Sequence, residues 1–297
     1  SLINNSLKVK NFDLIHASNL PSNISASIGA FLFKKKILWF CNEPILHMDG
    51  TKGKNTIFKL FFLKYFENLF LKNIDIVVSN SKNTAKNIKL AHNLNTELIY
   101  SGVDTKIFKK QILSGSSVKK LFFISRIEKH KNLDGLINIF KLVESRFSNV
   151  ELYIAGDGSY LKTLKKKLMS TEISKKIFIM GRISETEKIK MYSKSDIFLF
   201  PVFDEPLGVV PMESMLCECP VVAFNSGGPM ETILDLKTGF LCTSETEFSN
   251  RIIELLNDPI LAKTLGMQGR VWAKNNFSVE QMVDKTDKLY RSLLNNN

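Results

Sequence analysis

From Lys119 onward, short runs of β-branched and aromatic residues alternate with longer segments of helical periodicity. The runs, apolar nearly throughout, are KKLFFIS (119–125), VELYIAG (150–156), KIFIMG (176–181), DIFLFP (196–201) and PVVAF (220–224). The helical segments between them are NLDGLINIFKLVESRF, YLKTLKKKLM, SETEKIKMYSKS and the residues after Gly208. Apolar strands separated by helices are typical of a parallel sheet covered on both faces. The pattern therefore predicts a doubly wound α/β domain built from βαβ units.

The start of one helix can be placed closely, because Glu187 follows Ser184 by three residues. This spacing is a capping box and predicts that a helix begins just after the strand that ends at Gly181. In open parallel sheets, ligands bind outside the carboxyl ends of the strands. The loops predicted to line this binding edge are 126–131, 156–158, 181–184 and 203–208.

The first part of the chain shows the same pattern in shorter form. Its predicted strands are FDLIHA (12–17), KKILWFC (35–41), IDIVVSN (74–80) and TELIYSG (96–102). A doubly wound domain normally opens with a strand and a glycine-rich turn, and neither precedes Phe12, so we expect a first domain that is incomplete at its N-terminus. We predict a first domain at 1–112, a second at 113–280, and a C-terminal helix at 281–297 that returns to the first. The polar join between the halves is KKQILSGSSVKK (109–120).

Positive charge is concentrated in the first part of the chain. The 297 residues carry a net charge of +12, and the part through Leu113, with 16 lysines, no arginine and seven acidic residues, accounts for +9 of it. Such an excess attracts an anionic membrane surface, phosphorylated ligands or nucleic acid. Base reading depends on the bidentate guanidinium of arginine, which this part lacks, so nucleic acid is not expected as a partner. The alternative is a set of solvated surface lysines.

Cysteine content and hydropathy bear on the compartment. The four cysteines are too few for a disulfide framework, and the single residue between Cys217 and Cys219 is too short for a zinc knuckle. We therefore expect reduced thiols and a cytoplasmic protein. No apolar run reaches the roughly 18 residues of a membrane span. The Phe-rich segment 54–73 has a narrow polar stripe and is predicted to be either a buried helix or a helix on a membrane surface, which would make the protein peripheral.

Two carboxylates bracket an apolar turn in FDEPLGVVPMESM (203–215). Seven residues, including one glycine and two prolines, separate Glu205 from Glu213. Ionised carboxylates accept strong hydrogen bonds from hydroxyl groups, so the pair is typical of a site for a sugar or a ribose. The alternative is a strand end and a helix side chain that are acidic without a ligand.

Other residues at the same predicted edge suit phosphate. Arg126 and Lys131 lie five apart in SRIEKHKN, where two cations could neutralise a diphosphate and its departing charge. Gly208 and Val209 open a predicted helix, and free amides at a helix start bind phosphate. Gly156 in AGDGSY marks either a close approach of the backbone to a ligand or a plain turn.

Together these segments resemble the family 4 retaining glycosyltransferases, which have the GT-B fold: two Rossmann-like α/β domains that face a cleft. The matching segments, in the family's order and spacing, are IYSGVDTKIF, SRIEKHKN, YIAGDGSY, FPVFDEPLGVVPMESMLCECPVVAFNSGGPMETI and KTGFLC. The resemblance covers the chain from about Phe12 to its end. It implies a mannosyltransferase-like hexosyltransferase of glycan biosynthesis that uses a nucleotide sugar as donor and has no cofactor.

The resemblance also implies roles for single residues. Glu213 binds the ribose hydroxyls of the nucleotide, and Glu205 contacts the donor sugar. Arg126 and Lys131 hold the diphosphate.

It further implies that backbone groups complete the donor site. The turn at Leu207, Gly208 and Val209 directs its amides at the phosphates. The backbone near Arg182 and Ile183 holds the base.

The chain departs from the family in two places. Members begin with a strand and a glycine-rich loop that help to bind the acceptor, and we expect neither of them in this chain. Many members also carry a histidine at the end of the strand that here reads WFCNEP, where Cys41, Asn42 and Glu43 stand, with His47 beyond them. Asn42, Glu43 and His47 are therefore the predicted acceptor-side residues. Asn42 could bond to a sugar hydroxyl or cap a turn before Pro44.

We expect a reaction on the front face of the sugar, in which the departing phosphate oxygen takes the acceptor proton and the anomeric configuration is retained. Glu205 as a covalent nucleophile is the alternative. The acceptor would be a hydroxyl of a glycan or a lipid-linked molecule. No Asp-x-Asp pair occurs, so no metal is expected to bridge the diphosphate. Two other functions stay open: a nucleotide-sugar epimerase of the same shape, and a fragment that binds nucleotide sugars without catalysis.

Overall fold

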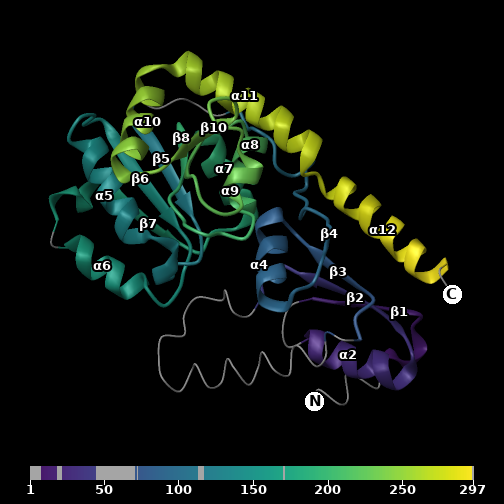
Figure 1. Ribbon diagram of the computed structural model, residues 1–297. Coiled ribbons are helices and arrows are strands. Elements are labelled where there is room, and N and C mark those ends of the chain that lie inside the picture. Colours follow the sequence, from purple (N-terminus) through teal and green to yellow (C-terminus); the bar gives the residue numbers. More distant parts are fainter. Residues whose placement is uncertain are drawn as a thin grey trace. The chain divides into compact units, whose positions relative to one another are not determined.

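The chain forms two compact α/β units, which a computed structural model describes at residues 8–18, 22–44, 71, 73–112, 117–169 and 171–295 (Figure 1). Unit 1 comprises Ser1–Gly102 and Glu280–Asn297, and unit 2 comprises Val103–Val279. The two α/β units confirm the predicted fold class of a pair of Rossmann-like domains.

Unit 1 is built on a four-stranded sheet in which every neighbouring pair is parallel. Its strands, in spatial order, are β1 (Leu14–Ala17), β2 (Lys36–Cys41), β3 (Ile76–Ser79) and β4 (Glu97–Leu98). The helical elements described in this unit are η1 (Val9–Asn11), α2 (Ser22–Phe33), α4 (Lys82–His92) and α12 (Val279–Asn295). All four predicted runs contain the strands, so this part of the prediction is confirmed.

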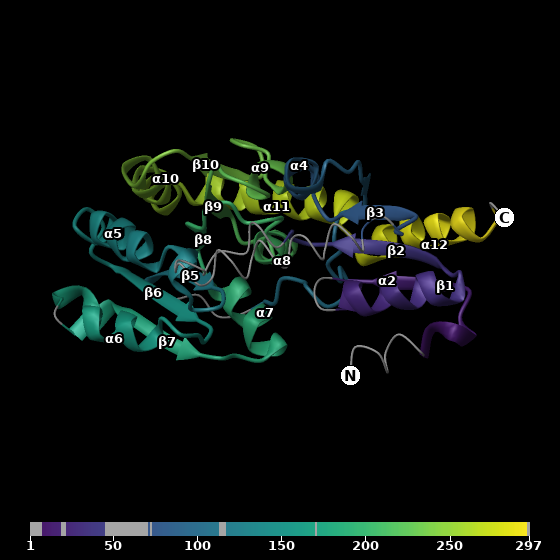
Figure 2. The same cartoon turned by 60° about the horizontal axis from the view of Figure 1, so that its bottom comes forward.

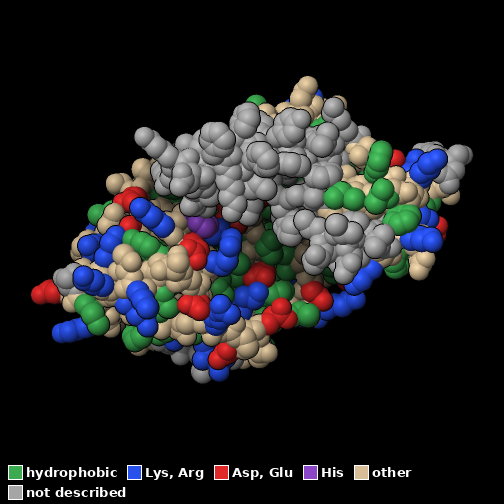
Figure 3. Space-filling model, turned by 90° about the horizontal axis from the view of Figure 1, so that it is seen from below, with side chains coloured by type: hydrophobic (Ala, Val, Ile, Leu, Met, Phe, Trp, Pro, Cys, Tyr) green, Lys and Arg blue, Asp and Glu red, His purple; other side chains and the backbone are tan. Residues whose placement is uncertain are grey.

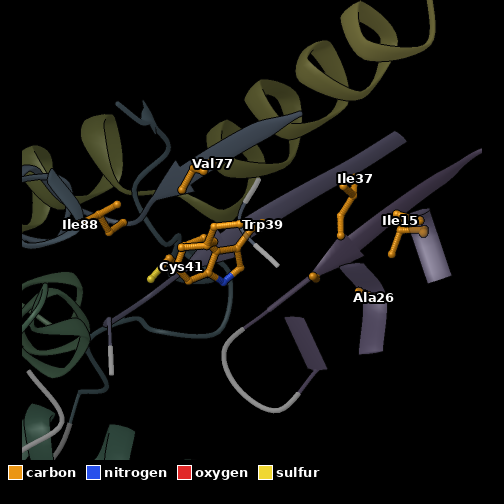
Figure 4. Close-up of a cluster of buried hydrophobic side chains, with 10 residues drawn as sticks. Ile15, Ala26, Ile37, Trp39, Cys41, Val77 and Ile88 are labelled. Atoms are coloured by element: carbon orange, nitrogen blue, oxygen red, sulfur yellow. The ribbon is translucent and has the colours of Figure 1, made fainter. Parts of the chain in front are cut away.

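The side chains of β2 alternate between two hydrophobic layers, as the period of a strand requires. Ile37, Trp39 and Cys41 pack with residues of α2 and α4, including Ala26 and Ile88 (Figure 4). The opposite face of the strand belongs to a second layer. That layer brings β2 and β3 against α12, and its buried members are Leu38, Val78, Ile99 and Leu293. The C-terminal helix therefore covers one face of the sheet of unit 1.

Unit 2 contains a six-stranded parallel sheet. Its strands are β5 (Lys119–Ile124), β6 (Val150–Ala155), β7 (Ile177–Gly181), β8 (Ile197–Phe200), β9 (Val221–Phe224) and β10 (Gly239–Cys242). The spatial order is β10-β9-β8-β5-β6-β7. The chain thus runs outward from β5 to β6 and β7 on one side. It then returns to the other side of β5 with β8 and runs outward to β9 and β10. Five of these strands were predicted, whereas β10 was not.

Helices lie on both sides of this sheet, with α5 and α6 on one side and α7 and α8 on the other (Figures 1 and 2). The helical elements are η3 (Lys129–Lys131), α5 (Leu133–Glu144), α6 (Leu161–Met169), η4 (Glu172–Lys176), α7 (Glu185–Lys194), α8 (Val209–Leu216), α9 (Pro229–Thr232), α10 (Glu245–Asn257) and α11 (Pro259–Asn276). The strands β8 and β9 are buried along their whole length, which explains why their sequences are apolar without alternation.

The predicted capping box at the start of α7 is confirmed. The Ser184 hydroxyl accepts a hydrogen bond from the Glu187 amide at 3.2 Å, and the Glu187 carboxylate accepts one from the Ser184 amide at 2.8 Å. Two backbone donors that the helix leaves unpaired are satisfied in this way. The helix therefore begins where the sequence placed it, directly after β7 and its short loop.

The boundary between the units lies at Gly102 and Val103, earlier than the boundary predicted after residue 112. Val103 is anchored in unit 2, because its amide donates to the Phe277 carbonyl at 2.8 Å and its carbonyl accepts from the Val279 amide at 3.1 Å. Phe108 is buried in the same unit. This stretch has no regular secondary structure, so nothing in its periodicity marked it as part of unit 2.

Some predictions fall outside the described residues. Of the Phe-rich segment 54–73, the structure describes only Leu71, which packs with the Trp39 layer, and Asn73. Neither alternative for that segment is tested, and His47 also lies outside. Among the described helices, none combines the length and apolarity needed to cross a membrane. All four cysteines are free and buried, and burial raises the pKa of the Cys217, Cys219 and Cys242 thiols to about 12.

Candidate functional site

The loops that carry most of the predicted site residues meet where the sheet of unit 2 reverses its strand order. Strands β5 and β8 are neighbours there, although β6 and β7 lie between them in sequence. Loops that leave the carboxyl ends of such a pair diverge to opposite sides of the sheet and leave a crevice, where ligands of doubly wound proteins bind. The loop after β5 holds Arg126 and Lys131, and the loop after β8 holds Glu205 and Gly208.

The loop after β5 is tied to the loop after β8 by an asparagine. Asn132 has a left-handed backbone with φ of 55°, a conformation that asparagine tolerates better than most residues. Its side-chain amide donates a hydrogen bond to the Pro201 carbonyl at 2.9 Å. The short η3 turn before it places Lys131 in the interior, while Arg126 stays exposed and forms no ion pair with any residue that the structure describes.

Lys131 and Glu205 form an ion pair across the crevice. Lys131 Nζ lies 2.6 Å from Glu205 Oε2, and the side chains are only 10% and 23% exposed, respectively. The Glu205 backbone is held as well, because its carbonyl accepts a hydrogen bond from the Gly228 amide at 2.7 Å. The structure therefore brings together the residue predicted to contact the donor sugar and one of the two predicted to hold the diphosphate.

Two glycines after β9 allow a third loop to reach this pair. A Cβ atom on Gly227 would lie 2.5 Å from the Glu205 carbonyl oxygen, and one on Gly228 would lie 2.2 Å from Leu207 Cα. Both distances are too short for any side chain, because the obstructing atoms belong to the backbone. These glycines were not predicted as site residues. The available signal was the pair of adjacent glycines that follows a strand and precedes Pro229.

The N-terminus of α8 faces the same loops with unprotected amides. Gly208, its capping residue, has φ of 83° and supplies no side chain, so no side-chain cap bonds to the first turn. Val209 and the residues after it carry no acidic group in that turn. Leu207 is 2% exposed and can offer only its backbone to a ligand. A helix start with free amides and a positive dipole end is suited to a phosphate group.

Glu213 lies one turn inside α8 and is buried between α8 and α7. Its carboxylate accepts hydrogen bonds from Lys188 Nζ at 2.7 Å and from the Tyr192 hydroxyl at 2.9 Å. Burial raises the pKa of Glu213, and the Lys188 ammonium and the Tyr192 hydroxyl oppose that rise. Lys188 also lies 4.8 Å from the centre of the Phe108 ring. A carboxylate has about four acceptor positions, so two remain for other hydroxyl donors.

Sequence reasoning missed Lys188 and Tyr192 as partners of Glu213, and Phe108 as the ring beside Lys188. Lys188 and Tyr192 are four residues apart and therefore share one face of α7. That spacing is common to many helices and does not indicate a buried carboxylate as the partner. Burial also raises the pKa of Tyr192 well above its ordinary value, so its hydroxyl stays a hydrogen-bond donor.

The loop after β6 approaches the loop after β5. Gly156 has φ of 123°, and a Cβ atom on it would lie 1.8 Å from the Ser125 carbonyl oxygen. The close approach that Gly156 allows is therefore to protein backbone, while the predicted contact with the donor is not tested. Glu128 joins the same loops, because its carboxylate accepts hydrogen bonds from the amide and the hydroxyl of Ser159, and these bonds lower the pKa of Glu128.

The loop after β7 is partly exposed to solvent. The Arg182 side chain is 84% exposed, and its Nε lies 3.2 Å from Asp157 Oδ2. Ile183 is half-buried. The predicted contact of this backbone with a base is not tested by the structure.

The acceptor-side residues belong to unit 1. Asn42 and Glu43 follow β2, and the Asn42 carbonyl accepts a hydrogen bond from Thr84 Oγ1 at 3.1 Å. Asn42 also lines a cavity of unit 1. Within the described ranges of the chain, no group of three or more His, Cys, Asp and Glu residues could hold a metal ion.

Comparisons with known proteins agree with this geometry. The sequence model of the family described as "Glycosyl transferases group 1" matches residues 104–272. The alpha-1,3/1,6-mannosyltransferase ALG2 of Homo sapiens is 28% identical over 298 residues, which cover 90% of this chain and 70% of the relative. A GDP-mannose-dependent phosphatidylinositol monomannoside mannosyltransferase of Corynebacterium glutamicum is 30% identical over 241 residues, covering 74% of this chain and 62% of the relative.

A solved structure shows the same fold. Anabaena HepE, determined in complex with UDP and glucose, superimposes with a TM-score of 0.85 at 20% identity and covers 98% of this chain and 81% of its own. The chain therefore has the GT-B fold and belongs to the glycosyl transferases group 1 family. Its relatives are transferases, so an epimerase or a non-catalytic binding fragment is not favoured.

Proposed function

We propose that this protein transfers a hexose from a nucleoside diphosphate sugar to a hydroxyl of a glycan or lipid-linked acceptor, with retention of the anomeric configuration and without a metal ion. The observation that carries the proposal is the Lys131–Glu205 ion pair at the strand-order reversal, next to the free amides of α8. Mannose is the first donor sugar to test, because several relatives are named mannosyltransferases.

In this proposal the phosphates of the donor lie at the N-terminus of α8. The amides of Gly208 and Val209 and the cations of Arg126 and Lys131 stabilise the charge that grows on the departing diphosphate. Glu205, held by Lys131, accepts a hydrogen bond from a hydroxyl of the donor sugar. The same ion pair thereby positions the sugar relative to the diphosphate.

The nucleoside end of the donor lies toward Glu213. Its carboxylate accepts hydrogen bonds from the ribose hydroxyls at the positions that Lys188 and Tyr192 leave unused. The backbone near Arg182 and Ile183 contacts the base.

In the transfer step, the acceptor oxygen forms a bond to the anomeric carbon while the bond from that carbon to the diphosphate oxygen breaks. The acceptor proton passes to the departing oxygen, and both events take place on one face of the sugar, which retains the configuration. Positive charge from the protein, in place of a divalent cation, stabilises the leaving group. Transfer in excess chelator should therefore equal transfer without it.

The site of action in this proposal is the cytoplasmic face of a membrane, which the protein contacts through unit 1. The net charge of +9 through Leu113 supports it. Further support comes from exposed apolar side chains at the end of α2, Phe31 and Leu32, which precede Lys34, Lys35 and Lys36 in the sequence. Hydrophobic side chains gather over α2 in the space-filling view (Figure 3). Apolar side chains next to lysines favour association with an anionic bilayer surface.

A transfer assay tests the proposed reaction. The purified chain is incubated with GDP-mannose, UDP-glucose or UDP-N-acetylglucosamine and a panel of neutral and lipid-linked acceptors, and released nucleoside diphosphate and product are measured. We expect a new glycosidic bond whose anomeric configuration, determined by NMR, matches that of the donor. An inverted product contradicts retention, a changed donor sugar without acceptor indicates an epimerase, and nucleotide binding without turnover indicates a binding fragment.

A further inference from the structure

The irregular segment 104–112 of unit 2 packs on α7, next to the candidate site. Phe108 lies in the middle of this segment and is only 4% exposed. The Lys188 ammonium on α7 lies 4.8 Å from the centre of its ring. The same ammonium donates a hydrogen bond to Glu213 Oε1 at 2.7 Å. Lys188 therefore connects segment 104–112 to the carboxylate that we assign to the ribose.

Hydrogen bonds hold segment 104–112 on both sides of this ring. Before the ring, the Phe108 amide donates to the Asp104 carbonyl at 3.0 Å and closes a turn. After it, the Gln111 amide donates to Ser193 Oγ on α7 at 3.0 Å. Because Ser193 and Lys188 belong to the same helix, the segment that carries the ring is fixed to the element that carries the ammonium.

The two partners of Glu213 are held in different ways. Tyr192 is fully buried, and the rings of Phe122 and Phe198 meet it edge-on with centres 5.4 and 5.3 Å away. The core packing therefore fixes the Tyr192 hydroxyl. The Lys188 side chain is 18% exposed and has a long flexible stem, so its ammonium stays at the carboxylate only if other contacts restrict it.

An aromatic ring is well suited to restrict this ammonium. The face of the ring is electron-rich and attracts a cation, and the attraction is stronger where water is largely excluded. A carboxylate or an amide oxygen at position 108 would compete with Glu213 for the protons of Lys188. Phe108 holds the ammonium without such competition, because its side chain has no hydrogen-bond acceptor of that kind.

We propose that Phe108 is a positioning residue for nucleotide binding: its ring holds Lys188, and Lys188 holds the Glu213 carboxylate in the orientation that accepts the ribose hydroxyls. The proposal rests on the proposed function, because it assigns the ribose to Glu213. Phe108 acts through Lys188, so its effect on nucleotide affinity requires the ammonium.

Fluorinated phenylalanines, incorporated at position 108 of the full chain, test the electrostatic contact. Ring fluorines withdraw electron density from the face of the ring and weaken its attraction for a cation, while the shape of the ring changes little. We expect the Kd for GDP or UDP, measured by calorimetry, to rise with one, two and three fluorines and to reach roughly three- to tenfold above native. In the Lys188→Met background the same series should leave the Kd unchanged.

Ordinary substitutions provide a second test. Phe108→Leu keeps an apolar side chain but removes the ring, and it should raise the Kd by a similar factor. Combined with Lys188→Met, it should weaken binding no further than Lys188→Met alone, because the two residues act in series. Ile107→Ala, an exposed change in the same segment, should retain native affinity. Melting temperatures confirm that each variant is folded.

Three results overturn the proposal. The first is a Kd that does not respond to the fluorines in the native background, which includes the case in which Phe108→Leu weakens binding by loss of packing alone. The second is an equal rise of the Kd in the Lys188→Met background. The third is an effect of Phe108→Leu no larger than that of Ile107→Ala.

The same titrations distinguish this proposal from the proposed function. If the native chain binds GDP or UDP and the fluorines have no effect, the nucleotide site is retained and the role of Phe108 is rejected. If the native chain binds neither nucleotide, the proposed donor site is rejected, and the role of Phe108 in binding with it. The fluorine series read in the free energy of unfolding then shows whether the ring and the ammonium interact without a ligand.

Discussion

Lys131 Nζ lies 2.6 Å from Glu205 Oε2, although the two residues are 74 positions apart in the sequence. Their loops follow β5 and β8, which are adjacent because the sheet reverses its strand order there. Each charge is largely removed from water, and the ion pair compensates part of that desolvation. The pair therefore fixes the predicted sugar contact and a predicted diphosphate contact relative to one another.

Replacing the cations of this site should reduce transfer. We expect Lys131→Met and Arg126→Ala each to lower turnover at saturating donor by roughly 10² to 10³, the scale for removing a preorganised charge partner. Lys129→Met, an exposed change in the same η3 turn, should retain native turnover. Thermal melting should show a loss of stability for Lys131→Met only, because the half-buried Glu205 carboxylate then loses its ion pair with Lys131. Activity within a few-fold of native in both active-site variants would remove these cations from the mechanism.

The two glutamates should act at opposite ends of the donor. Glu213→Gln is expected to weaken binding of the free nucleoside diphosphate, because the ribose is present with or without the sugar. Glu205→Gln should leave that affinity unchanged and lower turnover of the complete donor. Isothermal titration with GDP and UDP, together with steady-state kinetics, checks both. Equal losses of nucleoside diphosphate affinity in the two variants contradict the assignment.

Nucleotide affinity should depend on pH through Glu213. Burial raises the pKa of Glu213 above the ordinary value. When the pH is lowered, Glu213 should therefore be protonated, and nucleotide affinity should fall, at a higher pH than for an exposed glutamate. Lys188→Met removes the cation that opposes this rise in pKa, so the pH at which nucleotide affinity falls should be higher still. Lys190→Met, an exposed change on the same helix, should leave the pH profile unchanged. Titrations of affinity against pH that superimpose for the two variants would refute the role of Lys188.

The same raised pKa has a consequence for folding. Such a carboxyl group has a higher pKa in the folded than in the unfolded state. The stability that it contributes is fully present below the pKa of the unfolded state and is lost as the pH rises through the pKa of the folded state. Lys188→Met should raise the pKa of Glu213 in the folded state. The free energy of unfolding that this variant loses should therefore be largest at neutral pH and smaller near pH 4. Denaturant unfolding at the two pH values measures the difference.

Gly228→Ala should destabilise the protein by crowding the loops of the candidate site. The new Cβ would lie 2.2 Å from Leu207 Cα, so the backbone must move, and we expect a cost of about 1–3 kcal/mol or more in the free energy of unfolding. Gly181→Ala is the matched control, because it places a residue at φ of 71° but meets no atom within 4 Å. Denaturant melts of both should show the larger loss for Gly228→Ala. The reverse order would argue against close approach of these loops.

Association with anionic vesicles should depend on unit 1. Each lysine near an anionic leaflet contributes about 1 kcal/mol. Replacing Lys34 and Lys35 by Glu should therefore release the protein from anionic vesicles, and Phe31→Ser should weaken its binding to them. Lys162→Glu with Lys165→Glu, two exposed positions on α6 of unit 2, makes the same change in charge and should have little effect. Sedimentation with vesicles checks this, and equal binding to neutral and anionic vesicles, or binding unchanged by a tenfold rise in salt, contradicts it.

The strands of both units could be predicted because their signal is local. Runs such as VELYIAG and DIFLFP are rich in β-branched and aromatic residues and contain β6 and β8 within a residue or two. Strand β10, with the sequence GFLC, was missed because four residues give too little periodicity to detect. The unit boundary was missed for a related reason, because 103–111 packs on unit 2 through single contacts of an irregular segment, such as the 3.0 Å hydrogen bond from the Gln111 amide to Ser193 Oγ.

The amino-acid sequence determined the α/β class, the order of the elements and the residue types at the candidate site, because periodicity and short-range spacing encode all three. The partners of those residues were decided only by the tertiary structure. Glu213 meets Lys188 and Tyr192 because α7 and α8 pack on the same side of the sheet. His16 meets Tyr290 because the last helix packs on the first sheet. Such pairs depend on burial and strand order, which are properties of the whole fold and leave no mark in local spacing.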